Sequence, residues 1–168
     1  MIKGALIPKD NERYRYALWR VWDDELPFMN IIGLNPSTAD AVEDDPTIKS
    51  CIRIAKYNEY GGIYMTNLFA LRSTSPDRLQ WDIDPVGKGN DIQIIYYASV
   101  CDITVAAWGS KYTDLLGRAK KVISMLNDNG HNLYCFKLNK GGLPSHPLYL
   151  PANATRIHLF KKRVKHGR

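Results

Sequence analysis

The stretch "IIGLNPSTADAVEDDPTIKS" (residues 31–50) joins an apolar run to a helix start through a loop crowded with polar side chains. An apolar run that ends in Gly33 and, soon after, Pro36 is typical of a strand that enters a loop. Asp45 followed by Pro46 predicts a helix, with Asp45 as its N-cap and Pro46 at the first helical position. In an open α/β sheet, ligands bind outside the carboxyl ends of the strands, so the polar residues between these two elements are candidates for a binding site.

Strand and helix signals alternate outward from this stretch. Residues 14–22 and 27–34 are predicted strands, and we expect the acidic turn between them to make a hairpin that leads into the central strand. Further strands are predicted over residues 62–71, 102–108 and 131–138. Helices are predicted over residues 45–62, 90–100 and 110–130, the second capped by Asn90 or Asp91 and the third by Ser110. This alternation predicts one α/β domain over residues 1–168: a three-layer α/β/α fold with a central, mainly parallel sheet of about four strands and an N-terminal β-hairpin extension.

The composition is that of a soluble globular protein, with 45% apolar and 24% charged residues. No apolar run of about 18 residues is present, so the sequence predicts no membrane span. The N-terminal residues lack the apolar core of a signal peptide, which favours a cytoplasmic location. Cys51, Cys101 and Cys135 are far apart in apolar stretches, and we expect them to be buried free thiols. We expect no metal and no cofactor, since neither a metal-ligand spacing nor a phosphate-binding glycine loop occurs. Of the possible oligomeric states, a monomer is favoured.

The charge is uneven along the chain. The net charge is +6, and the tail from about residue 156, "RIHLFKKRVKHGR", carries six lysines and arginines without an acid. Such a tail can lie along phosphates, so DNA or a nucleotide is the expected partner, with Lys161, Lys162 and Arg163 as candidate contacts. The alternative is a solvated C-terminus without a specific partner, and the sequence favours neither.

Polar side chains follow each predicted parallel strand at its carboxyl end. Strand by strand, they are Asn35, Ser37, Thr38 and Asp40; Asn67; Trp108, Ser110 and Lys111; and, after a longer loop, His146. Because the carboxyl ends of parallel strands lie along one edge, we expect these groups to converge on one crevice. Each has an ordinary alternative, such as a turn former at Asn35, a helix cap at Ser110 or a rigid proline-flanked loop at His146.

Four short motifs carry a resemblance to the uracil-DNA glycosylase superfamily. "GLNPS" (33–37) is similar to its first motif, closest to the Gly-Ile-Asn-Pro-Gly form of the mismatch-specific branch. "GGIYMTNLFALR" (61–72), "ITVAAWGSKYTDLL" (103–116) and "SHPLYL" (145–150) resemble later motifs, in the same order. The whole set, "GLNPSTAD…DDPTI…NLFALR…AAWGS…HPLYL", is closer still to a bacterial and phage family catalogued as domain of unknown function 1643 (DUF1643), which has no assigned reaction.

The resemblance implies a glycosylase-like fold and hydrolysis of a pyrimidine N-glycosidic bond in DNA or in a nucleotide. His146 would donate to the pyrimidine O2 as negative charge grows there, Asn67 would pair with the N3 and O4 edge, and Asn35 would hold the attacking water. Where that superfamily has other residues after the histidine, this chain has Leu148, Tyr149 and Leu150, which can wedge into or stack on a base step, or else pack in the core. Further substrate contacts are implied for Gly33, Leu34, Pro36, Ser37, Trp108, Ser110 and Lys111.

One departure from the uracil branch concerns the general base. Asn35 stands where that branch has a water-activating aspartate, and an amide cannot take a proton, which forfeits a factor of about 10² or more in rate. Asp40 and Asp44 are open candidates to restore the base. For Glu43 and Asp45 we favour helix capping and favourable charge at a helix N-terminus.

A second departure concerns the substrate. Ser37 stands where the uracil branch has a bulky tyrosine, so the pocket is expected to leave room for a 5-substituted pyrimidine. The loop after His146 also lacks the Ser-Pro-x-x-Ser run that grips DNA in that branch. Two other functions therefore stay open. One is a non-catalytic module that binds nucleic acid or a modified base, and the other is a pocket for a small phosphorylated metabolite, with Ser110 and Lys111 at a helix N-terminus.

Overall fold

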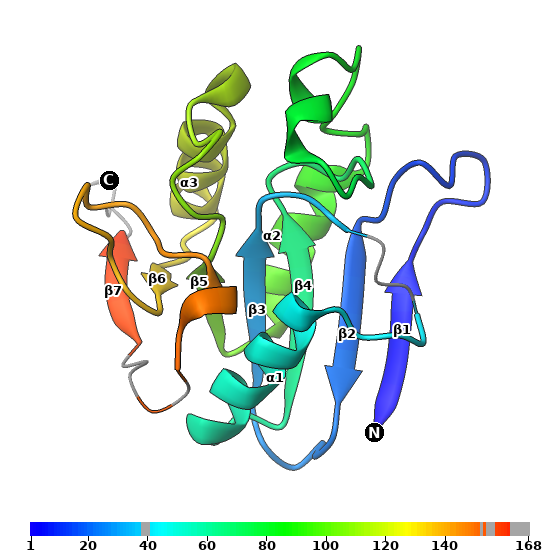
Figure 1. The fold of residues 1–168 in the computed structure, drawn as a ribbon. Helices are drawn as coiled ribbons and strands as arrows, with labels where there is room; N and C mark the ends of the chain where they lie inside the picture. Colours follow the sequence, from blue (N-terminus) through cyan, green and yellow to red (C-terminus); the bar gives the residue numbers. More distant parts are fainter. Residues whose placement is uncertain (38–40, 152, 154–156, 162–168) are drawn as a thin grey trace.

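The computed structural model of the chain describes residues 1–37, 41–151, 153 and 157–161. These residues form a seven-stranded sheet with helices on both faces (Figure 1). The strands are β1 (Ile2–Leu6), β2 (Ala17–Val21), β3 (Phe28–Gly33), β4 (Gly62–Asn67), β5 (Ile103–Ala106), β6 (Leu133–Cys135) and β7 (His158–Lys161). The α-helices are α1 (Pro46–Tyr57), α2 (Asn90–Val100) and α3 (Arg118–Asp128), and the short 3-10 helices are η1 (Pro76–Gln80), η2 (Leu115–Gly117) and η3 (Pro147–Tyr149).

Four parallel strands make the centre of the sheet, in the order β4-β3-β5-β6. β5 and nearly all of β3 are buried, as their apolar runs predict for parallel strands that helices cover on both faces. The outer strands β1, β2 and β7 run antiparallel to the neighbours they pair with. All four central strands therefore have their carboxyl ends at one edge.

The expected hairpin between residues 14–22 and 27–34 is wrong, because β4 lies between β2 and β3. β2 pairs antiparallel with β1 and with β4, so the N-terminal hairpin is β1–β2. The turn from β2 to β3 wraps around Gly61: the N–H groups of Trp22 and Asp23 donate to its carbonyl oxygen at 2.9 and 3.0 Å. A Cβ at Gly61 would lie 1.9 Å from the Asp23 carbonyl oxygen, so this close approach requires glycine.

The sheet has more strands than the expected four or so because its edges give weak sequence signals. Most residues of β1 and β7 are exposed or half-buried, so pairing with a neighbour rather than an apolar pattern specifies them. β7 takes residues 158–161 of the basic segment into the sheet beside β6, so this part is not a frayed tail. The rest of the basic segment lies outside the described residues, apart from Ile157.

α1 covers one face of the sheet, and α2 and α3 cover the other (Figure 1). Side chains alternate along each strand, so Met29 and Ile31 of β3 pack with α1 whereas Ile32 packs on the side of α2 and α3. The three layers are those that the alternation of strands and helices predicts. In the part of the chain that the structure describes, no helix has the length and apolar character that a membrane crossing requires.

The start of α1 and the bounds of α2 are confirmed, but the end of α1 and the cap of α2 differ from prediction. Asp45 is the N-cap of α1, and its carboxylate accepts the N–H of Ile48 at 2.8 Å. The helix ends at Tyr57, before the predicted end at residue 62. α2 is capped by Gly89, because the buried Asn90 side chain instead donates to two backbone carbonyl oxygens at the end of β4, at 3.0 and 3.1 Å.

α3 begins at Arg118 rather than at Ser110, and the third predicted cap is therefore wrong. Tyr112 and Leu116 have left-handed φ values of 63° and 52°, which interrupt any α-helix over residues 110–117 and leave only the short 3-10 helix η2. The Thr113 hydroxyl donates to the carbonyl oxygen of Ser110 at 2.8 Å, so this segment is an ordered loop. Asp91, the alternative cap of α2, instead pairs with Arg118 at 2.8 Å.

Candidate functional site

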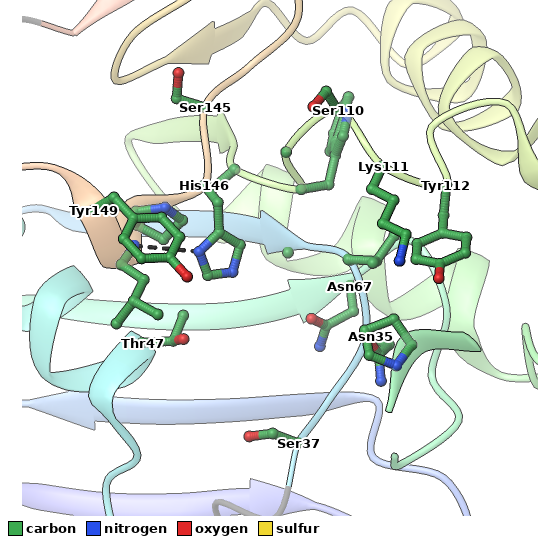
Figure 2. A pocket seen from close by; sticks show the side chains of 18 of the residues that line it. Asn35, Ser37, Thr47, Asn67, Ser110, Lys111, Tyr112, Ser145, His146 and Tyr149 are labelled. Carbon is green, nitrogen blue, oxygen red and sulfur yellow. Dashed lines mark hydrogen bonds between the residues drawn. The ribbon is translucent and has the colours of Figure 1, made fainter. Parts of the chain in front are cut away.

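A cavity of about 910 Å³, the main cavity, lies at the carboxyl edge of the central strands. Its wall combines the ends of β3 and β4, the first turn of α1, the loop after β5 and the loop from β6 through η3. Figure 2 shows side chains from these separate segments gathered around it. The predicted site residues that line it are Gly33, Leu34, Asn35, Ser37, Asn67, Trp108, Ser110, Lys111, His146, Leu148 and Tyr149. The strand-end groups thus converge, as the parallel topology predicts.

The other predicted site residues are placed elsewhere or lie outside the described part. Pro36 is buried and does not line the main cavity. Lys161 lines a second cavity of about 400 Å³, together with Lys120 and His131. Asp40, Lys162 and Arg163 lie outside the described residues.

Asn67 ends β4 on the face toward α1, two residues after Met65. It is 4% exposed, and its amide Nδ2 is buried without a hydrogen-bond partner among the described residues. Gly33, its partner in the register with β3, makes room for it, since a Cβ there would lie 2.7 Å from Asn67 Oδ1. A buried donor without a partner costs about 1–3 kcal/mol, which a ligand that accepts its hydrogen bond would recover.

His146 directly precedes η3, and its Nδ1 accepts the N–H of Leu148 at 3.3 Å (Figure 2). In the neutral imidazole the proton then sits on Nε2. Burial lowers the pKa of His146 below its ordinary value, and the Asp45 carboxylate opposes this shift only in part. At physiological pH the ring is therefore a neutral hydrogen-bond donor at the wall of the main cavity.

Two hydrogen bonds hold the His146 loop against α1. The hydroxyl of Ser50 donates to the carbonyl oxygen of Pro147 at 2.8 Å, and Arg53 donates to that of Leu150 at 3.1 Å. η3 thus rests on the helix that Asp45 caps. This contact fixes the position of His146 relative to the strand ends.

Asn35 is anchored through its amide nitrogen. Nδ2 donates to the carbonyl oxygens of Pro36 and Ser73, both at 3.0 Å, and reaches that of Leu71 at 3.5 Å. Among the described residues, no group donates to the side-chain oxygen. Asn35 can therefore accept a hydrogen bond from water or a ligand, but it has no group that takes a proton.

Trp108 and Tyr149 contribute aromatic surface in different ways. Trp108 is 2% exposed, packs edge-on against Phe160 with ring centroids 6.2 Å apart, and has an Nε1–H without a partner in the described part of the chain. Tyr149 is 83% exposed at the rim. The core alternative for Tyr149 is therefore wrong, whereas Leu148 is half-buried in the lining.

The acids before α1 have separate roles. Asp44 forms ion pairs with buried Arg20 at 2.6 Å and with Lys3 at 3.3 Å, so it holds the loop to the edge of the sheet. Glu43 is exposed and does not line the main cavity. Asp45 caps α1 as expected, but it also lines the main cavity, which sequence reasoning missed.

Basic residues outnumber acids around the main cavity. Lys111, Lys137 and Lys140 line it and are exposed, and buried Arg15 also lines it. Lys111 lies 3.5 Å from Asp77, an exposed pair that contributes little. A positive cavity attracts anionic ligands. Sequence reasoning missed Arg15, Lys137 and Lys140, because nothing in a strand or a loop pattern shows which way such side chains point.

Comparison with known proteins gives a family but no reaction. A family model described as "Protein of unknown function (DUF1643)" matches residues 15–148. This chain belongs to that family. No curated protein and no solved structure matches the chain. The DUF1643 match runs from Arg15 to Leu148 and so includes all the described residues that line the main cavity except Tyr149 and Leu150.

Proposed function

We propose that this DUF1643 protein binds a pyrimidine nucleotide unit, in DNA or free, and hydrolyses its N-glycosidic bond. The observation that carries the proposal is the pair formed by Asn67 and His146. A buried amide whose nitrogen has no partner among the described residues and a neutral imidazole donor line the same cavity. Together they match the two demands of the chemistry, which are recognition of the base edge and stabilisation of the departing base.

Asn67 supplies the recognition. Its amide offers a donor and an acceptor side by side, which complements the O4 and N3–H groups of uracil or thymine. The amide nitrogen is already desolvated, so a base that accepts its hydrogen bond gains more than it would from an exposed group. A base lacking the matching groups would leave the amide unpaired and would be rejected.

His146 supplies the stabilisation. When the bond between C1′ and the base nitrogen breaks, negative charge develops on the base, including its O2. A donor held at that position, in a site that excludes water, is usually the largest catalytic term. A neutral imidazole serves this purpose, because its Nε2–H donates without a change of charge. Asn35 Oδ1 is available to hold a water beneath the sugar.

Two further observations support the proposal. The motifs that contain Asn35, Asn67 and His146 resemble those of the uracil-DNA glycosylase superfamily in kind and order. The exposed lysines that line the main cavity offer contacts for the phosphates on either side of a nucleotide.

The direct test is base release. Oligonucleotides that carry uracil, mismatched thymine or 5-hydroxymethyluracil, single- and double-stranded, and the corresponding nucleotides are incubated with the protein. Free base is measured by mass spectrometry, and abasic sites by alkaline cleavage. We expect release by the wild type and a loss of about 10²–10³-fold in His146→Gln. His131→Gln is the matched control, since His131 lines the second cavity. If the wild type releases no more base than His146→Gln on any of these substrates, the proposal is contradicted.

A second candidate is a module that binds a modified base without cleaving it. Asn35 favours it, because an amide stands where a glycosylase of the uracil branch has its catalytic carboxylate. This candidate predicts salt-dependent binding by the wild type without base release. The phosphorylated-metabolite pocket is not favoured, since Ser110 and Lys111 lie in a loop eight and seven residues before α3 and not at a helix N-terminus.

A further inference from the structure

Asp45 supplies the one carboxylate among the described residues that line the main cavity. Its Oδ1 accepts the backbone N–H of Ile48 at 2.8 Å, and its Oδ2 accepts the hydroxyl of Ser37. A carboxylate has about four acceptor positions, so an acceptor position remains on each oxygen. Asp45 is thus fixed in place and still able to take a proton.

The placement of Asp45 relative to His146 is also fixed. Asp45 caps α1, His146 caps η3, and the hydrogen bond from Ser50 to Pro147 joins these two elements. An acceptor for a proton and a donor toward the base are therefore held on adjoining walls of one cavity. Asn67, whose Nδ2 has no partner among the described residues, lines the same cavity at the strand ends. A ligand that pairs with it would lie beside both Asp45 and His146.

We propose that Asp45 is the general base of the reaction and that Ser37 is a positioning residue that orients its carboxylate. The inference rests on the proposed function. The water oxygen forms a bond to C1′ while the bond from C1′ to the base nitrogen breaks, and that electron pair leaves with the base. Asp45 takes one proton from the attacking water and later returns it to the base or to solvent. The products are the free base and a sugar with a hydroxyl group at C1′.

The first test is Asp45→Asn, which keeps a side-chain oxygen for the helix cap but cannot accept the proton. We expect base release to fall by about 100-fold or more, the usual scale of general-base catalysis, with only a small drop in melting temperature from the lost charge at the N-terminus of α1. Glu43→Gln is the matched control, since it removes an exposed acid of the same loop. If the wild type releases base and Asp45→Asn releases it at the same rate, the inference is overturned and the proposed function still stands.

The pH profile separates a base from a merely structural residue. We expect the rate of the wild type to fall at acid pH and this acid limb to be absent in Asp45→Asn. Two titratable groups lie within the electrostatic reach of Asp45. Burial lowers the pKa of His146 and Asp45 opposes part of that shift, whereas burial raises the pKa of Cys51 and Asp45 adds to the rise. The other charged residues of the described lining are Arg15, Lys111, Lys137 and Lys140. Lysines and arginines stay protonated through the acid range, so a limb that survives in Asp45→Asn would belong to His146 and would contradict the inference.

Ser37 is tested by two small changes. Ser37→Ala removes the hydroxyl that orients Asp45, and we expect kcat to fall by about tenfold, the scale of one hydrogen bond to a charged group, with KM unchanged. Ser37→Thr keeps the hydroxyl and should restore most of the rate. Equal effects of Ala and Thr would contradict the positioning role.

A binding measurement tests Asp45 without turnover. One oligonucleotide carries an abasic analogue with a protonated pyrrolidine nitrogen in place of C1′, and its partner carries the neutral tetrahydrofuran analogue. A carboxylate beside C1′ favours the cation, so we expect the wild type to prefer it by about tenfold or more. Asp45→Asn should lose this preference and Glu43→Gln should keep it. Equal binding of both analogues by the wild type, or a preference that survives in Asp45→Asn, would overturn the inference whether or not base is released.

Discussion

The sheet buries polar side chains in two regions that differ in how fully their hydrogen bonds are made. In its middle, Thr66 donates to Asn30 Oδ1 at 3.1 Å, and Asn30 Nδ2 reaches Thr104 Oγ1 at 3.5 Å. At its carboxyl edge, Asn67 is nearly as buried, but its Nδ2 has no partner among the described residues. Neighbouring parallel strands thus carry one paired and one unpaired asparagine.

The two regions also lie on opposite faces. Asn30 and Thr66 alternate with Ile31 and Met65, which pack with α1, so they face α2 and α3. Asn67 lies on the α1 face, where the main cavity opens beyond the first turn of the helix. A paired polar group in a core stabilises one strand register, whereas an unpaired one at a cavity stabilises nothing until a ligand arrives.

The largest effect that separates the two regions is expected for Asn67→Ala. This change removes both hydrogen bonds to the base edge, and we expect affinity for a uracil-containing oligonucleotide to fall by about 100-fold, or roughly 3 kcal/mol for two buried bonds. The unfolding free energy should hardly change, because the amide nitrogen donates no hydrogen bond to any of the described residues. Fluorescence anisotropy and urea unfolding measure the two quantities. A marked loss of stability with unchanged affinity would make Asn67 a structural residue like Asn30.

The converse result is expected for Asn30→Ala. Thr66 loses its acceptor and Thr104 its donor, both in a fully covered part of the sheet, so the unfolding free energy should fall by about 2 kcal/mol. Ligand affinity should not change, since Asn30 does not line the main cavity. Thr66→Val is the matched control. It removes only the hydrogen bond from Thr66 to Asn30, so it should lower the unfolding free energy by less. Urea unfolding measures the loss of stability. If Asn30→Ala loses ligand affinity but not stability, Asn30 and not Asn67 has the binding role.

The convergence at the carboxyl edge could be predicted from the sequence because it depends on local signals and one topological rule. The apolar runs of residues 27–34 and 62–71 mark parallel strands, and parallel strands end at one edge, although β4 ends at Asn67 and not at residue 71. The start of α1 was equally local, since Asp45 and Pro46 are adjacent. Neither prediction required knowledge of which strands are neighbours.

The features that sequence reasoning missed depend on contacts between distant residues. The insertion of β4 between β2 and β3 depends on the fit of Gly61 against the turn at Asp23. The loop that replaces the first two turns of the expected third helix contains left-handed Tyr112 and Leu116, and such conformations have no sequence signal outside glycine and asparagine. Asp45 lines the main cavity as well as capping α1, and η3, which packs on the same helix and completes this wall, lies about a hundred residues later in the chain.

The smallest expected effect concerns Ser37, which combines features of both regions. Its hydroxyl has a partner, Asp45, as the polar groups in the middle of the sheet do, and it lines the main cavity as Asn67 does. In Ser37→Tyr a ring occupies space beside the pyrimidine C5, and a clash with a 5-substituent should cost at least about 1 kcal/mol. We therefore expect binding of thymine relative to uracil to fall by about fivefold to tenfold, measured with otherwise identical oligonucleotides. Ser37→Ala controls for the lost contact to Asp45, because that loss affects both ligands equally and leaves their ratio unchanged. A ratio that is the same in wild type, Ser37→Ala and Ser37→Tyr would mean that Ser37 orients Asp45 but does not select the base.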